Sequence, residues 1–132
     1  MRTTEAVWVN GCFDVLHRGH IELFKYASSL GKRLIVGIDS DDRIKNAKGE
    51  NRPFNTLCDR KFILSSIRYI DLVVDYESDA ELEYYINMFK PKIMVVGSDW
   101  RGKKVIGEQY AGKVVFFERI GEHSTTRILE GI

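Results

Sequence analysis

Five short apolar runs, separated by longer and mostly polar segments, constrain the fold of this chain more than any other feature. They lie at residues 7–9, 33–38, 71–74, 93–97 and 113–117. A strand that is apolar on successive residues is typical of a parallel sheet covered on both faces, because both rows of its side chains are then buried. We therefore predict one strand from each run.

The segments between these runs have the apolar spacing of amphipathic helices. The predicted helices cover residues 16–30, 56–68, 80–89 and 125–130, and the polar segment 39–55 is predicted to be a loop or a short helix with a loop. Gly31 is the expected C-cap of the first helix. Because strands alternate with helices through right-handed crossovers, we predict an α/β fold: a Rossmann-like open parallel five-stranded sheet with helices on both faces.

Composition limits the classes of function. The chain has 132 residues, of which 44% are hydrophobic, and shows no linker or repeat, so we expect a single domain over residues 1–132. Its net charge of +1 favours neither nucleic acid nor an anionic membrane as a partner. No apolar stretch approaches the ~18 residues of a membrane span. We expect a cytoplasmic protein, in which Cys12 and Cys58 are small buried side chains.

Polar and glycine-containing segments follow three of the predicted strands. They span residues 10–20, 97–104 and 119–126. In open parallel sheets, ligands bind outside the carboxyl ends of the strands, at the topological switch point. The three segments are therefore predicted to form one site.

The segment from Asn10 to His20 has the character of an anion-binding loop between a strand and a helix. Gly11 lets the backbone approach a phosphate closely. His17 and His20 are three residues apart, so they share one helical face and could both donate to charge that develops on a phosphate chain. The alternative is one buried core histidine and one solvated histidine. A metal site here would have only Asp14 as a further ligand.

Four motifs, in order along the chain, resemble those of the cytidylyltransferase-like nucleotidyltransferases. Residues 11–20 resemble the HxGH signature, 68–71 the RYVD segment, 97–100 the GDDW segment, and Arg119 with 124–126 the RTEGISTT segment. Class I aminoacyl-tRNA synthetases share a related signature, but they are far longer and carry a KMSKS-type loop that this chain lacks.

The resemblance implies a set of nucleotide-binding residues, with Mg²⁺ as the cofactor. These residues are Asn10, Gly11, Cys12, Phe13, Asp14, Gly19, Gly97, Asp99, Trp100, Ser124, Thr125 and Thr126. Residues 124–126 would bind the β- and γ-phosphates with Arg119, although hydroxyl residues here could equally cap a helix. Trp100 could stack on the base or pack against the sheet. Asp14 could orient either the metal or the loop.

The resemblance also assigns the catalytic and acceptor-binding residues. His17, His20, Lys48 and Arg119 would be catalytic, and Lys45 and Arg60 would hold the phosphorylated small-molecule acceptor. For the lysines, a solvated surface is the alternative. An oxygen of the acceptor phosphate would attack the α-phosphorus in line, with pyrophosphate as the leaving group. Residues 68–71 would lie at a homodimer interface.

The choice of nucleotide divides the motifs into two groups. Residues 68–71 and 97–100, with Arg119, resemble glycerol-3-phosphate cytidylyltransferases, whereas residues 10–14 and 48–55 resemble the adenylyltransferase domain of ADP-heptose synthases. We expect CTP and a phosphorylated polyol or sugar. The alternative is ATP with a sugar 1-phosphate such as heptose 1-phosphate. A non-catalytic nucleotide-binding module is a third possibility, which the presence of both histidines disfavours.

Overall fold

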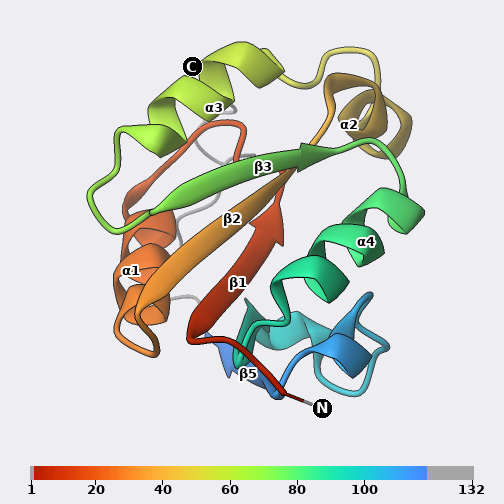
Figure 1. The fold of residues 1–132 in the computed structure, drawn as a ribbon. Coiled ribbons are helices and arrows are strands. Elements are labelled where there is room, and N and C mark those ends of the chain that lie inside the picture. Colours follow the sequence, from red (N-terminus) through yellow and green to blue (C-terminus); the bar gives the residue numbers. More distant parts are fainter. Residues whose placement is uncertain (1, 119–132) are drawn as a thin grey trace.

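The five predicted strands form one parallel sheet in the order β3-β2-β1-β4-β5 (Figure 1). The computed structural model describes residues 2–118. The strands are β1 (Ala6–Gly11), β2 (Arg33–Asp39), β3 (Leu72–Tyr76), β4 (Ile93–Gly97) and β5 (Lys113–Phe117). The predicted fold class is therefore confirmed. The helix expected at 125–130 lies outside the described residues.

Four α-helices and two short 3₁₀ helices connect the strands. They are α1 (Arg18–Ser28), α2 (Asp41–Lys48), α3 (Leu57–Ser65), α4 (Asp79–Phe89), η1 (Ser98–Trp100) and η2 (Glu108–Tyr110). The polar segment after β2 thus contains a short helix, one of the two alternatives left open by the sequence. Ser40, Thr56 and Ser78 begin α2, α3 and α4 by accepting a backbone N–H of the first turn.

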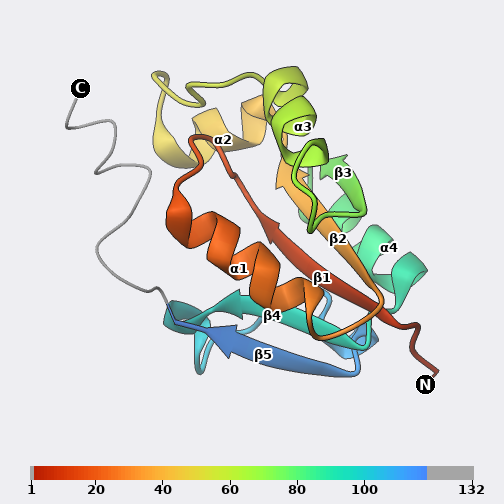
Figure 2. The same ribbon diagram turned by 90° about the vertical axis from the view of Figure 1, so that its left-hand side faces the viewer.

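Helices cover both faces of the sheet (Figure 2). On one face, Val7 and Val9 of β1 pack with residues of α1 and α3, including Phe24 and Leu64. On the other face, Trp8 packs with α4 through residues such as Ile86. Because successive strand residues point to opposite faces, one apolar run supplies both cores. No helix of residues 2–118 is long and apolar enough to span a bilayer.

Two local predictions were wrong. Gly31 is not the C-cap of α1, because the helix ends at Ser28 and Ser29 is its C-cap. A Cβ at Gly31 would lie 2.6 Å from the carbonyl oxygen of Glu5, so the glycine is needed for close approach to the start of β1. Cys58 is exposed and Cys12 half-buried. Cys58 faces solvent because α3 turns Arg60 and Leu64 toward the core, and position 58 lies on the opposite side of the helix.

The pairing pattern identifies the topological switch point. β1 pairs with β4 only at Val7↔Ile93 and Trp8↔Met94. Beyond these pairs, β1 continues with β2 as far as Gly11↔Ile38, and β4 continues with β5 as far as Gly97↔Phe117. The carboxyl ends of β1 and β4 are therefore not joined by strand pairing, and ligands of open α/β sheets bind at such a place.

Candidate active site

The two motif histidines build the start of α1. His17 is the N-cap, and its Nδ1 accepts the backbone N–H of Gly19 at 3.0 Å. The Nδ1 of His20 accepts the backbone N–H of His17 at 3.1 Å. This reciprocal arrangement is a capping box made of imidazoles. The prediction that the two histidines share one face is confirmed, since their ring centroids lie 3.9 Å apart.

The cap also sets the tautomer of both rings. A neutral imidazole that accepts a hydrogen bond at Nδ1 carries its proton on Nε2. Each of His17 and His20 is therefore an N–H donor at Nε2 when neutral. Two donors held side by side at a helix N-terminus suit the charge on a phosphate chain.

Phe13 packs against the second of the two histidines. Its backbone lies in the left-handed region with φ 48°, a conformation that costs a non-glycine residue about 1–3 kcal/mol and is found mostly at functional sites. The buried ring packs edge-on against His20, with 5.6 Å between centroids. It also folds over Gly11, where an added Cβ would lie 3.2 Å from the ring. A side chain at position 11 would therefore have to push the Phe13 ring aside by a few tenths of an ångström.

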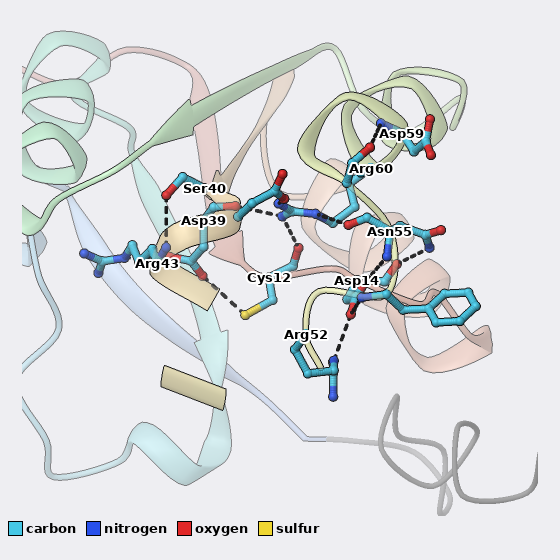
Figure 3. A network of polar contacts seen from close by, with 12 residues as sticks. Cys12, Asp14, Asp39, Ser40, Arg43, Arg52, Asn55, Asp59 and Arg60 are labelled. Carbon is cyan, nitrogen blue, oxygen red and sulfur yellow. Dashed lines mark hydrogen bonds and ion pairs between the residues drawn. The ribbon is translucent and has the colours of Figure 1, made fainter. Parts of the chain in front are cut away.

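Asp14 is buried and ties the loop after β1 to residues 52–55 (Figure 3). Its Oδ2 accepts from Arg52 Nε at 2.9 Å and from the backbone N–H of Phe54 at 2.7 Å. Its Oδ1 accepts from the backbone N–H of Asn55 at 2.7 Å. Burial alone would raise the pKa of Asp14, but these hydrogen bonds outweigh it and hold the pKa below its ordinary value. The carboxylate therefore orients the loop.

Arg60 is also buried, with a side chain that is 0% exposed. Its Nη1 donates to the carbonyls of Cys12 and Asp39, at 3.0 and 2.7 Å. Its Nε donates to the carbonyl of Asn55 and its Nη2 to Asp41, at 3.1 and 2.7 Å. In this structure Arg60 is a positioning residue that joins β1, β2, α2 and the 52–55 segment. Direct contact with an acceptor stays an untested prediction.

Cys12 lies between acidic and basic neighbours. Its Sγ is 3.4 Å from Asp39 Oδ2, to which it donates. Burial raises the pKa of the Cys12 thiol, the Asp39 carboxylate adds to this, and the charges of Lys48 and Arg60 offset it in part. Lys48 is the last residue of α2. Lys45 is on the same side of α2, and both lysines are exposed.

A pocket of about 450 Å³ lies on the other side of α2. It is lined by Ser40, Asp42, Arg43, Asn46, Ala47 and Glu77. Positions 42, 43, 46 and 47 occupy the helix surface opposite positions 45 and 48. Arg43 of this pocket and Cys12 of the loop after β1 both donate to the Asp39 carboxylate, so the pocket adjoins that loop through Asp39.

The segment after β4 forms the other side of the switch point. Asp99 folds back over Gly97, where an added Cβ would lie 2.6 Å from Asp99 Oδ1, so a side chain at position 97 would displace the carboxylate. Trp100 is 45% exposed and Lys103 Nζ lies 5.9 Å from its ring centroid. The ring is therefore not packed against the sheet, which was one of the two alternatives that the sequence left open.

The other predicted residues are placed as follows. Asn10 is the next-to-last residue of β1 and accepts from Trp8 Nε1 at 2.9 Å, and Gly19 lies in the first turn of α1. Asp71 accepts the backbone N–H of Leu34 at 2.8 Å, so this part of the 68–71 segment holds the sheet. Arg119 and Ser124, Thr125 and Thr126 lie outside the described residues.

Few of the described residues could bind Mg²⁺. Asp14, the candidate ligand, accepts from protein donors at both carboxylate oxygens. Residues 2–118 contain no cluster of three or more His, Cys, Asp or Glu residues that could hold a metal ion. Mg²⁺ is commonly bound by substrate phosphates with one or two carboxylates rather than by a protein cage. The described residues therefore do not form a metal site by themselves, and Mg²⁺ stays a prediction.

Sequence reasoning missed the 52–55 segment as part of the site. Residues 48–55 were noted only for their resemblance to the adenylyltransferase domain of ADP-heptose synthases, whereas Phe54 and Asn55 contribute through backbone N–H groups that no side-chain pattern reveals. The sequence did contain one usable signal, the combination of Asp14 in a glycine-containing loop with the later Arg52-Pro53. A buried aspartate needs hydrogen-bond donors, and an arginine is a suitable one.

The fold, the histidine cap and the switch point suit a site that binds phosphate. Residues 8–128 match the model of the cytidylyltransferase-like family, and the chain belongs to this family. It is accordingly a nucleotidyltransferase.

Curated relatives refine this assignment. The chain is 42% identical over 132 residues to the bifunctional protein HldE of Helicobacter hepaticus, which is 100% of this chain and 27% of that protein. It is 42% identical over 129 residues to HldE of a Nitratiruptor species, covering 98% of this chain and 28% of that protein. The chain thus spans about a quarter of the length of the curated relatives it matches.

Solved structures share the fold. The lipopolysaccharide core biosynthesis protein from Thermoplasma volcanium superposes with a TM-score of 0.69 at 24% identity, covering 90% of this chain and 98% of that one. The pantothenate synthetase from Thermus thermophilus superposes with a TM-score of 0.61 at 13% identity, covering 92% of this chain and 58% of that one. These likenesses show the fold alone.

Proposed function

We propose that this chain transfers AMP from ATP to a sugar 1-phosphate, such as heptose 1-phosphate, and releases pyrophosphate. One observation carries the choice: the two segments that resemble the adenylyltransferase domain of ADP-heptose synthases, 10–14 and 48–55, form one unit around Asp14. The 42% identity to HldE proteins over the whole chain supports the same choice.

CTP, which the sequence alone favoured, has weaker support. Of the segments that suggested it, 68–71 includes Asp71, which holds the backbone of Leu34 at the start of the sheet. Because Asp71 has this structural role, its presence does not indicate whether the nucleotide base is cytosine or adenine. The curated relatives favour the ATP alternative.

The reaction requires positioning more than chemical activation. An oxygen of the acceptor phosphate attacks the α-phosphorus of ATP in line, a P–O bond to the acceptor forms, and the bond to pyrophosphate breaks. A phosphate monoester is already a nucleophile, so no covalent enzyme intermediate is needed. His17 and His20 donate to the charge that develops, and Lys48 approaches from α2. Arg119 with residues 124–126 is our candidate for binding the β- and γ-phosphates.

Three further expectations belong to this proposal. Mg²⁺ would neutralise the triphosphate, held chiefly by the phosphates themselves. Two copies would associate through residues 68–71. The reaction would take place in the cytoplasm, where ATP is available.

Pyrophosphate release tests the proposal directly. The protein is incubated with ATP or CTP and with heptose 1-phosphate, glucose 1-phosphate or glycerol 3-phosphate in all combinations. We expect the highest kcat/KM with ATP and a sugar 1-phosphate. Preference for CTP and glycerol 3-phosphate would overturn the choice of substrates, and no release in any combination would favour the non-catalytic module.

A further inference from the structure

Two buried charges hold the 52–55 segment against the β1 loop. Asp14 and Arg60 are two of the three buried polar or charged residues of the described chain. They bind the segment from both sides, since Asp14 accepts the backbone N–H of Asn55 and Arg60 donates to its carbonyl. Buried charges are costly unless fully hydrogen-bonded, and here each is. The backbone of this surface segment is therefore fixed relative to the site.

One large apolar side chain is exposed on this fixed backbone. Arg52 is turned inward to Asp14, with a side chain that is 14% exposed, and Asn55 donates its amide to the Asp14 carbonyl. Phe54 lies between these two residues in the sequence. Its backbone nitrogen is 2.7 Å from the Asp14 carboxylate, but the residue is 66% exposed. Isolated exposed apolar residues are common on protein surfaces. Here the backbone nitrogen of Phe54 is bound by Asp14, which precedes His17 by three residues.

We propose that Phe54 is the specificity-determining residue for the acceptor and packs against the C–H face of its sugar ring. This inference rests on the proposed function. With the acceptor phosphate in line with the α-phosphorus that the β1 loop would bind, the sugar extends beyond this loop, and a ring of carbons with hydroxyls at its edge presents apolar faces. Covering such a face with an aromatic ring removes apolar area of both partners from water. Glycerol 3-phosphate, which has no ring, gains far less.

The test compares Phe54→Ala and Phe54→Tyr with wild type and with Tyr84→Ala. Tyr84 is a matched control because it is 63% exposed on α4, which covers the opposite face of the sheet from α1. KM is measured for ATP and for heptose 1-phosphate, and calorimetry gives the Kd of heptose 1-phosphate and of inorganic phosphate. Because Phe54 is exposed, the alanine variant should fold normally, which thermal unfolding checks.

We expect Phe54→Ala to raise the KM and Kd of heptose 1-phosphate about tenfold, the loss of one well-packed aromatic contact. The KM of ATP and the Kd of inorganic phosphate should not change. Phe54→Tyr, which keeps the ring, should stay near wild type, as should Tyr84→Ala.

Several results would overturn the inference. These are an unchanged KM for heptose 1-phosphate in an active Phe54→Ala variant, an equal rise in the KM of ATP, or dissociation of a dimer with both KM values unchanged. Wild-type protein that forms no product with any sugar 1-phosphate would instead overturn the proposed function itself. The two failures are therefore distinguishable.

Discussion

The loops that follow β1 and β4 lie at the ends of neighbouring strands, but they are held in opposite ways. The β1 loop, residues 11–17, is fixed by the side chains of Asp14 and Arg60, with partners from three other segments. The β4 loop, residues 98–104, is held by its own short turns, in which the backbone N–H groups of Arg101 and Lys103 donate to the carbonyls of Ser98 and Trp100. It contacts β5 through the exposed Arg101 guanidinium, which lies 4.7 Å from the Phe116 ring centroid. Residues 99–104 are exposed.

This difference suits two roles within the proposed site, a rigid loop that stabilises charge and an adaptable loop that covers the nucleotide. Groups that stabilise a developing charge work best when they are in place before the reaction, because no free energy is then lost on reorganising them. A loop that only covers the nucleotide can adapt as it binds. The β1 loop should therefore respond to mutation like part of the core, and the β4 loop like a surface. Four changes test this comparison.

The largest effect is expected at the histidines. His17→Ala and His20→Ala should each lower turnover about 10²–10⁴-fold, because each removes a donor to the transferred phosphate. His17→Asn separates this role from the cap, since Asn is a preferred N-cap residue. It should restore the thermal stability of α1 but not turnover. A folded double alanine variant with near wild-type turnover would contradict the catalytic role.

Arg60 and Arg101 form the next comparison. Arg60→Met leaves a buried network without its donors and should lower the free energy of unfolding by about 3–5 kcal/mol. Arg101→Met, in the β4 loop, removes the contact of an exposed guanidinium with Phe116 and should lower the free energy of unfolding by no more than about 1 kcal/mol. Urea unfolding of both variants measures the difference, and equal losses would refute the contrast between the loops.

Asp14 should make the β1 loop sensitive to acid. Its pKa is lowered in the folded state, so it contributes stability that is fully present above the unfolded carboxyl pKa of ~3.9 and lost as pH falls through the folded value. Asp14→Asn should lower the free energy of unfolding at pH 7 by about 1.5–3 kcal/mol and flatten its decline in acid. Asp99→Asn, in the β4 loop, is the control and should change neither.

The smallest effect is expected at Trp100. Trp100→Ala should weaken ATP binding about five- to tenfold if its half-exposed ring stacks on the base, as aromatic residues do in nucleic-acid sites. Trp100→Phe should recover most of the affinity. Calorimetric titration with ATP measures both variants. An unchanged Kd for the alanine variant would mean that the ring contacts no nucleotide.

Strand positions could be predicted because parallel strands bury both faces and leave uninterrupted apolar runs. The start of α1 was predicted two residues early because histidine is not among the usual N-cap residues, so His17 gave no signal. α2 stayed ambiguous since Ile44 is its one buried residue.

The site was predictable only in its local part. His17 and His20 interact within one helical turn, which spacing reveals. The partners of Asp14 and Arg60 lie tens of residues away, and no short pattern encodes such contacts. A buried guanidinium and a surface one also look the same in a sequence, so the role of Arg60 in holding the loop could not be foreseen.

The long reach of these contacts has a consequence for how the protein acquires activity during folding. The donors to Asp14 come 38 to 41 residues after it, and the arginine that binds Cys12 comes 48 residues after that cysteine. Contacts of this separation form late, once the intervening chain has been ordered. A growing chain that has completed β1, α1 and β2 would therefore have a helix end and two histidines but no competent phosphate loop until residues 52–60 join it.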